Sequence, residues 1–497
     1  MSAPARRAFF TLLALVVFLA GWDLWVLSVD QMYQGSDTYL QAIIHIDELY
    51  RGLGGPGWAA SLGPKGPVAP VLGVILLQLV GTAWAASRLL AILCHLLVVI
   101  QCHDLGRRLG GTYRAGLLSA ALCGLSPMIY GWGRLPFHDI VVAVMVLASL
   151  QIMLRLDLSR LRSAALFGVV LGLGLMTKLS FVIFMAAPGI WFLATRVRSG
   201  RQALGLGVMT AATLACCGWW LLPIAQETLQ YARQSSDQPL EDVWWAGLYH
   251  YLTLPGMALI SAGALAGTVA LWRWRREVRS YLWPLAGAAL LSLVVHGMVA
   301  SFWSRYMVPM VPLAALLAGA GLAVALSRLP EVWARAAAWG LTAGLIGAFI
   351  GTNLVGDHRL QASRSGDAGM VSPDPRPYRG FASAARAWGP RAMEMSWAQD
   401  CNFATADTVG VEVLWNTRGL PIKESTTPLH ERSGPIPVML VRHQPDTPVD
   451  QVEQGVGPSQ GKKQASQWLL ERQDSRRIWT AMDPDGLVFQ AYWVGKQ

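Results

Sequence analysis

Residues 8–29, AFFTLLALVVFLAGWDLWVLSV, form the first long apolar run of the chain, and the polar stretch 30–70, DQMYQGSDTYLQAIIHIDELYRGLGGPGWAASLGPKGPVAP, follows at once. About 20 apolar residues in a helix are enough to cross the hydrocarbon core of a bilayer. The run follows a short basic N-terminus, but it is too long for the apolar part of a signal peptide. We therefore expect an uncleaved membrane helix followed by a polar loop at the membrane surface.

The composition extends this interpretation to most of the chain. Its 497 residues are 54% hydrophobic and 14% charged, which leaves too little charge to cover the surface of a soluble protein. We predict an α-helical polytopic membrane protein with about 11 transmembrane helices. The expected spans are 8–29, 83–103, 112–131, 139–154, 163–177, 179–195, 203–222, 251–271, 281–300, 307–327 and 333–353. The short apolar segment 68–81 is expected to be interfacial.

The character of the sequence changes after the last predicted span. Residues 357–379 form a linker rich in serine, proline and glycine, and residues 380–497 contain short runs of alternating apolar and polar residues. We therefore predict a membrane domain over 1–356 and a small α/β or α+β domain over 380–497. Its expected strands are 409–415, 436–442 and 486–494, and its expected helices are 380–388 and 462–473.

The basic residues indicate an orientation rather than a nucleic-acid partner. The net charge is +10, and the excess of lysine and arginine lies in residues 1–356. Most of the arginines between the predicted spans fall in alternate loops, as the positive-inside rule requires of cytoplasmic loops. The N-terminus is then cytoplasmic, whereas the first loop, 30–82, and the C-terminal domain face outward. We expect a multi-pass protein of the cytoplasmic (inner) membrane.

The first outer loop carries the leading catalytic candidate, Asp37, in the sequence GSDTY. A carboxylate at a membrane surface can act as a general base, although the same residue type is common in solvated turns. A second candidate, Asp139, begins a predicted span and follows His138. Asp139 also suits a helix N-terminus, where its charge complements the helix dipole. No second histidine stands at a metal-ligand spacing.

Three cations lie at predicted outer ends of spans. Lys65 stands between glycines and prolines, Lys178 interrupts a long apolar stretch, and Arg305 precedes Tyr306 at the entrance of a later span. Isolated interfacial cations commonly anchor helices, but several on one face favour the binding of an anionic substrate.

Seven sequence features in order resemble the GT-C superfamily of polyprenyl-phosphate-sugar-dependent glycosyltransferases, in particular the protein O-mannosyltransferase and aminoarabinose lipid A transferase branch. The features, over roughly residues 8–330, are GSDTY, GPKGPVAP, Ser87-Arg88-Leu89, LGRRLGG (105–111), LSPMIYGWGRLPFHD (125–139), LMTKLSF (175–181) and RYMVPMVP (305–312). The chain departs from the family pattern at Thr38, Gly66 and Leu179, where the family usually has an acidic residue, a proline and a glycine.

The resemblance implies specific roles. Asp37 is the catalytic base and Asp139 a second acidic group in the cavity. Basic residues hold the lipid-linked phosphate, and other polar residues of the same motifs line the substrate site. The residues expected to bind substrate are Lys65, Arg88, Arg134, His138, Lys178, Arg305, Tyr306 and Glu48. Asp47 or Glu48 would replace the missing acidic neighbour of Asp37, and both equally suit the solvated face of a helix over 38–51.

We therefore predict an inverting membrane glycosyltransferase that moves a sugar from a polyprenyl-phosphate carrier to a lipid, glycan or protein acceptor at the outer face. One alternative is a transporter or flippase of a lipid-linked or anionic substrate, which would require functional charges at mid-membrane. Another is an oligosaccharide polymerase or ligase. Two carboxylates would suffice to hold a divalent cation, but no ligand spacing in the sequence indicates one.

Overall fold

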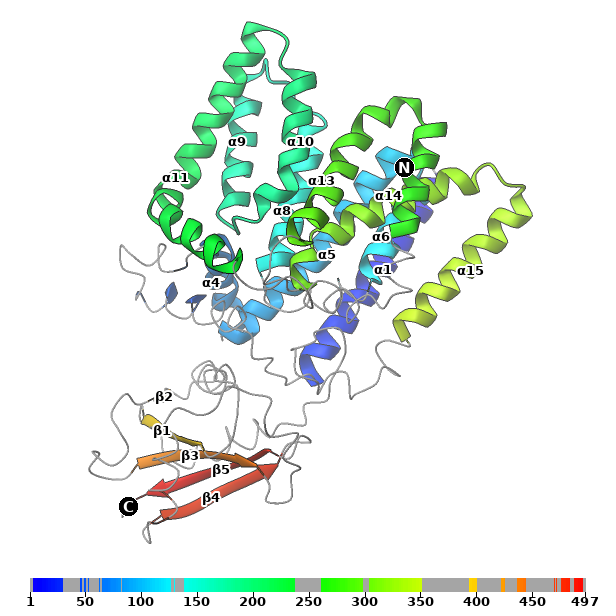
Figure 1. Cartoon of the computed structure of the whole chain (residues 1–497). Coiled ribbons are helices and arrows are strands. Elements are labelled where there is room, and N and C mark those ends of the chain that lie inside the picture. Colours follow the sequence, from blue (N-terminus) through cyan, green and yellow to red (C-terminus); the bar gives the residue numbers. More distant parts are fainter. Residues whose placement is uncertain are drawn as a thin grey trace. The chain divides into compact units, whose positions relative to one another are not determined.

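The computed structural model describes residues 3–29, 65–81, 83–126, 138–236, 261–297 and 304–350, five strands, and the isolated residues 45, 46, 49, 50, 52, 62, 129, 469 and 471. Most of the helical residues form one compact unit, and the strands belong to a second (Figure 1). The helices are α1 (Ala3–Val29), α4 (Val68–Val80), α5 (Ala83–Gly110), α6 (Tyr113–Gly124), α8 (His138–Met153), α9 (Leu161–Leu175), α10 (Phe181–Arg196), α11 (Gly200–Ser236), α13 (Arg279–Gly297), α14 (Met310–Leu326) and α15 (Glu331–Ile350).

Local sequence explains where several of these helices end. The helix α5 continues past its predicted end at 103 because the polar residues that follow still favour a helix. Asp104 forms an ion pair with Arg108 one turn later. After α5, Gly111 adopts a positive φ of 71°, which glycine tolerates at a helix end. Thr112 then caps α6 by accepting a hydrogen bond from the Ala115 N–H over 3.2 Å.

Most described helices coincide with predicted spans within a few residues, and α11 differs most because it continues past residue 222 to Ser236. Four of the described helical stretches are long and apolar enough to cross a membrane: Ala5–Trp25, Ala85–Gly110, Gly200–Ala225 and Arg276–Val295. Shorter apolar helices accompany them. The chain is thus a multi-span helical membrane protein, and its number of spans stays a prediction.

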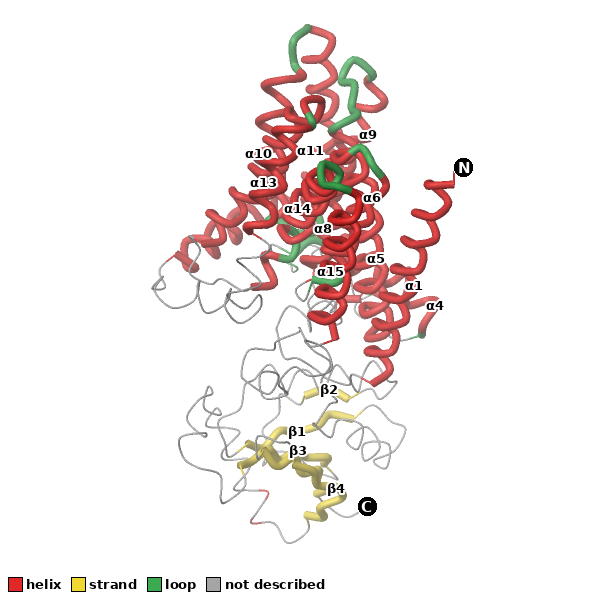
Figure 2. Tube along the Cα trace, turned by 90° about the vertical axis from the view of Figure 1, so that its right-hand side faces the viewer, coloured by secondary structure: helices red, strands yellow, loops and turns green. Residues whose placement is uncertain are grey.

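The helices pack pairwise, with α9 along α11, α6 along α14 and α10 along α13 (Figures 1 and 2). The helix α8 is buried along almost its entire length, and apolar residues cover all of its sides. Other helices expose large apolar side chains, including Leu222, Leu166 and Ile190. Such exposure suits contact with lipid tails, whereas α8 forms the centre of the helical unit.

Small residues allow close contact between helices. A Cβ atom added to Gly319 in α14 would lie 2.5 Å from the backbone nitrogen of Ser119 in α6. The Ser119 hydroxyl donates to the Leu316 carbonyl across the same contact, over 3.5 Å. Backbone therefore meets backbone between α6 and α14, with no room for a side chain.

The strands form a mixed sheet in the order β2-β1-β3-β5-β4. They are β1 (Met393–Gln399), β2 (Ile422–Glu424), β3 (Ile436–His443), β4 (Ser475–Met482) and β5 (Leu487–Val494). The pairs β1–β2 and β1–β3 are parallel, whereas β3–β5 and β4–β5 are antiparallel. The strands predicted at 436–442 and 486–494 are confirmed as β3 and β5. The predictions at 409–415 and 380–388 lie outside the described residues, and β1, β2 and β4 were not predicted.

We expect Gly319→Ala to lower the thermal unfolding temperature of the detergent-solubilised protein by several degrees. The added methyl group must push α6 away from α14, at a cost of about 1–3 kcal/mol. Gly344→Ala in α15 is the matched control, because a Cβ atom there meets nothing within 4 Å. Equal unfolding temperatures for the two variants would contradict the close contact.

Candidate functional site

The site begins at the first turn of the buried helix α8. His138 and Asp139 are its first two residues, and they are 1% and 2% exposed. A carboxylate in the first turn is stabilised by the N-terminal end of the helix dipole. Because the helix is buried on all sides, its N-terminus carries these two polar side chains into the interior of the helical unit.

An ion pair connects Asp139 to the turn between α9 and α10. The Lys178 Nζ atom donates to Asp139 Oδ1 over 2.6 Å, and the two side chains are 13% and 3% exposed. The same ammonium lies 4.3 Å from the centroid of the Tyr306 ring, a cation–π contact. Tyr306 belongs to the 3-10 helix η2 (Ser304–Met307). Three residues predicted separately from sequence thus meet at one point.

Backbone pairing attaches the proline- and glycine-rich segment to the same turn. Lys65 and Lys178 are partners in an isolated antiparallel bridge. The Gly66 N–H donates to the Thr177 carbonyl over 3.2 Å, and the Val68 N–H donates to the Met176 carbonyl over 3.3 Å. Opposed residues in such a bridge have Cβ atoms about 5 Å apart. Two lysines are therefore anchored side by side.

The charges of this cluster explain why the two lysines can lie together. Like charges that face each other destabilise a pair of strands, and the carboxylate of Asp139 offsets one of them. Lys65 and Lys178 bring two ammonium groups to a partly buried position. Lysine contacts a phosphate as a point charge.

Glycine is required at position 66 for this pairing. A Cβ atom there would lie 1.7 Å from the carbonyl oxygen of Met176, which is backbone and cannot rotate away. The departure from the family's Lys-Pro-Pro pattern at Gly66 therefore has a local reason. The segment approaches the 176–178 turn too closely for any larger residue.

Arg88 lies in the second turn of α5 and is 2% exposed. Asp37, Glu48 and Arg134 lie outside the described residues, and Arg305 is described by its backbone in η2 alone. The structure therefore brings together Asp139, Lys178, Tyr306 and Lys65. The relation of Asp37 to this cluster stays a prediction.

Sequence reasoning missed a second buried pair, between α1 and α5. His95 Nδ1 lies 2.7 Å from Asp23 Oδ2, and both side chains are fully buried. The available signal was the presence of Asp23 inside the first apolar run, because an ionisable residue within a membrane helix indicates function by default.

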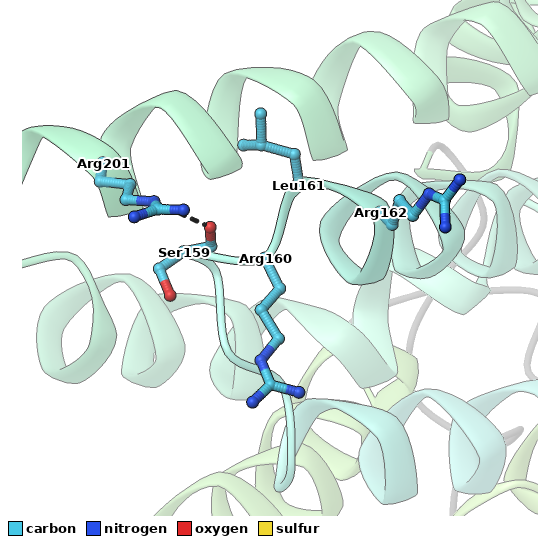
Figure 3. A pocket seen from close by; sticks show the side chains of 5 residues that line it. All are labelled: Ser159, Arg160, Leu161, Arg162 and Arg201. Atoms are coloured by element: carbon cyan, nitrogen blue, oxygen red, sulfur yellow. Dashed lines mark hydrogen bonds between the residues drawn. The ribbon is translucent and has the colours of Figure 1, made fainter.

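A hollow of about 500 Å³ lies at the other end of α8, lined by Ser159, Arg160, Leu161, Arg162 and Arg201 (Figure 3). The three guanidinium groups point in different directions, so they do not converge on one ligand. The Ser159 hydroxyl donates to Asp157 over 2.6 Å and holds the pKa of that carboxyl below its ordinary value. These contacts order the loop and supply no catalytic cluster.

The described residues also contain no group of three histidine, cysteine or acidic side chains that could hold a metal ion. The charged side chains at the start of α8 and in the 176–178 turn therefore remain the leading site within the described part of the chain.

The ion pair at α8 predicts unequal effects of removing its two partners. Lys178→Met leaves the charge of Asp139 buried and uncompensated, so we expect a loss of about 3–5 kcal/mol in stability. Asp139→Asn leaves the lysine, which can extend its long side chain toward water, and should cost less. The combined variant Lys178→Met/Asp139→Leu should recover most of the loss. Thermal unfolding in detergent measures all three, and equal losses in the two single variants would contradict the burial argument.

One family model matches part of the chain. Residues 64–221, which contain Lys65, Arg88, Asp139 and Lys178, match the sequence model of the dolichyl-phosphate-mannose-protein mannosyltransferase family. No curated protein sequence matches the chain.

Three solved structures are similar in fold. ArnT from Cupriavidus metallidurans bound to undecaprenyl phosphate has a TM-score of 0.59 and 18% identity, covering 96% of this chain and 97% of that chain. The apo state of the same protein has a TM-score of 0.57 and 19% identity over the same shares. The arabinofuranosyltransferase AftD from mycobacteria has a TM-score of 0.53 and 14% identity, covering 97% of this chain and 40% of that chain. Residues 64–221 thus match the dolichyl-phosphate-mannose-protein mannosyltransferase model, and nearly the whole chain shares the fold of ArnT.

Proposed function

We propose that the chain transfers a sugar from a polyprenyl-phosphate carrier to an acceptor at the outer face of the cytoplasmic membrane. The observation that carries this proposal is the backbone bridge that fixes Lys65 beside Lys178, next to Asp139 and Tyr306. The similarity to ArnT, whose structure contains undecaprenyl phosphate, supports a carrier of this class. The sugar and the acceptor are left open.

The cations have different tasks in this proposal. Lys178 is committed to Asp139 and to the Tyr306 ring, so it holds the wall of the site in place. We assign the direct phosphate contact to Lys65, with Arg88 and Arg305 as further cations. A phosphate that leaves an anomeric carbon gains negative charge, and fixed cations stabilise that charge in the transition state.

Asp37 is the proposed base. Its carboxylate takes the proton from the acceptor nucleophile as the nucleophile attacks the anomeric carbon. The bond between that carbon and the phosphate oxygen breaks, and its electron pair leaves with the phosphate. The configuration at the anomeric carbon is inverted. The second acid, Asp139, acts through Lys178 and takes no proton. The C-terminal domain is proposed to lie outside the membrane as an accessory domain.

One observation favours the transporter alternative, because Asp23 and His95 form a buried hydrogen-bonded pair between two apolar helices. The family match over residues 64–221 favours the transferase. A direct assay separates the two: a transporter moves the lipid-linked sugar across a vesicle membrane without cleaving it, whereas the transferase releases undecaprenyl phosphate. A polymerase or ligase would instead require a diphosphate-linked donor.

We expect Asp37→Asn to reduce sugar transfer by about 100-fold or more while binding of undecaprenyl phosphate is retained, because general-base catalysis contributes this much. Transfer is measured as release of undecaprenyl phosphate from undecaprenyl-phosphate-linked sugars by the purified chain. Asp30→Asn, in the same polar stretch, is the control and should keep its activity. Full transfer by Asp37→Asn would refute the proposed base.

We expect Gly66→Ala to weaken binding of undecaprenyl phosphate, because its methyl group must break the bridge that anchors Lys65. Lys65→Met should weaken binding by a similar factor, and the two changes together should add little. Gly189→Ala in α10 is the matched control, since a Cβ atom there meets nothing within 4 Å. Equilibrium binding of radiolabelled undecaprenyl phosphate checks this, and unchanged binding by Gly66→Ala would argue against the assigned phosphate contact.

A further inference from the structure

The buried pair between α1 and α5 has no role in the mechanism above. Asp23 is the single acidic residue of α1, and it meets His95 across 72 residues of sequence with an Oδ2–Nδ1 distance of 2.7 Å. Both side chains are fully buried. Ionisable groups inside membrane helices are expensive and are kept chiefly where they serve function. Replacement of such a buried pair by well-packed apolar residues of similar volume often leaves stability unchanged or raises it.

Apolar packing already joins these helices on one side of the pair. Leu19 of α1 and Val99 of α5 belong to one buried cluster, which also includes Phe349 of α15. Asp23 lies one helical turn beyond Leu19, and His95 lies one turn before Val99. The two helices run in opposite directions, so the polar pair extends their contact by one turn toward the end of α1 and the start of α5.

That extension leads along α5 toward Arg88. His95 lies seven residues after Arg88, so the two share one face of α5 about 10 Å apart. Arg88 is 2% exposed. On the other helix, α1 ends at Val29, six residues after Asp23. The first loop with Asp37 follows. The pair therefore lies on the face of α5 that carries Arg88, and on α1 it lies six residues before the helix ends.

The pair also retains hydrogen-bonding capacity. Within the described part of the chain, Asp23 Oδ1 and His95 Nε2 are buried without a hydrogen-bond partner. Burying an unsatisfied polar atom costs free energy. If the pair only joined the two helices, apolar side chains would do so without this cost.

We propose that Asp23 and His95 are positioning residues, whose hydrogen bond fixes α1 against α5 and so sets Arg88 where the donor phosphate needs it. This inference rests on the function proposed above. A directional pair fixes the rotation and depth of two helices, whereas apolar contacts alone allow sliding. Small misplacements matter, since a shift of about 1 Å can cost on the order of 100-fold in rate.

The test uses the purified full chain in nanodiscs and radiolabelled undecaprenyl phosphate. Asp23→Leu/His95→Leu removes the pair but keeps the volume apolar, so we expect a thermal unfolding temperature at or above that of the natural protein. Affinity for undecaprenyl phosphate should nevertheless fall about tenfold, the consequence of a change of 1.4 kcal/mol in binding free energy. Gln101→Leu is the control, because Gln101 is a buried polar residue of α5 that donates to the Val144 carbonyl over 3.3 Å. It should bind undecaprenyl phosphate normally.

Combining these changes with a change at Arg88 distinguishes a positioning role of the pair from a general effect on stability. Arg88→Met alone should weaken binding, and adding Asp23→Leu/His95→Leu to it should weaken binding no further, because the pair acts through Arg88. Full additivity, or unchanged affinity in Asp23→Leu/His95→Leu, overturns the positioning role and leaves the proposed function intact. Failure of the natural protein to bind undecaprenyl phosphate overturns both.

Discussion

The ion pair between Lys178 and Asp139 is the interaction on which the candidate site depends. It joins the start of the buried helix α8 to the turn between α9 and α10, and the same ammonium lies against Tyr306. The backbone of the same turn also accepts hydrogen bonds from the N–H groups of Gly66 and Val68. Four segments from distant parts of the sequence thus meet around the Lys178–Asp139 ion pair. Without the carboxylate, two opposed lysines would repel each other at a position that is largely removed from water.

Two pairs of ionisable side chains lie in the interior of the helical unit. Asp23 pairs with His95 and Asp139 with Lys178, whereas the exposed arginines gather at loops such as 159–162. Apolar burial alone contributes little between helices in a membrane, because lipid tails are as apolar as leucine. Close glycine contacts, as at Gly319, and a small number of directional polar pairs therefore determine how the helices are arranged. In the proposed enzyme, the same pairs also set the positions of the catalytic cations.

Much of the architecture follows from local sequence. Apolar length predicts the helices because every backbone polar group in hydrocarbon must be satisfied within its own helix. Alternation predicts β3 and β5 because a half-buried strand has a period of two. The strand β1, MEMSWAQ, and the strand β4, SRRIWTAM, were missed. Their polar residues weaken the alternating pattern, and pairing with neighbouring strands decides their conformation. The polar end of α11 was missed for a related reason, since a hydropathy window ends where charge begins.

The sequence by itself determined that this chain is a multi-span membrane protein, and it identified Asp139, Lys178, Tyr306 and Lys65 as candidates from their residue types and positions at span ends. Only the tertiary structure decided that these four meet, that Gly66 must be a glycine, and that Asp23 lies against His95. Hydropathy is a property of a few neighbouring residues, so it can be read along the chain. A contact between residues 65 and 178 depends instead on how whole helices pack, because their free energy of association is spread over many side chains that no local pattern records.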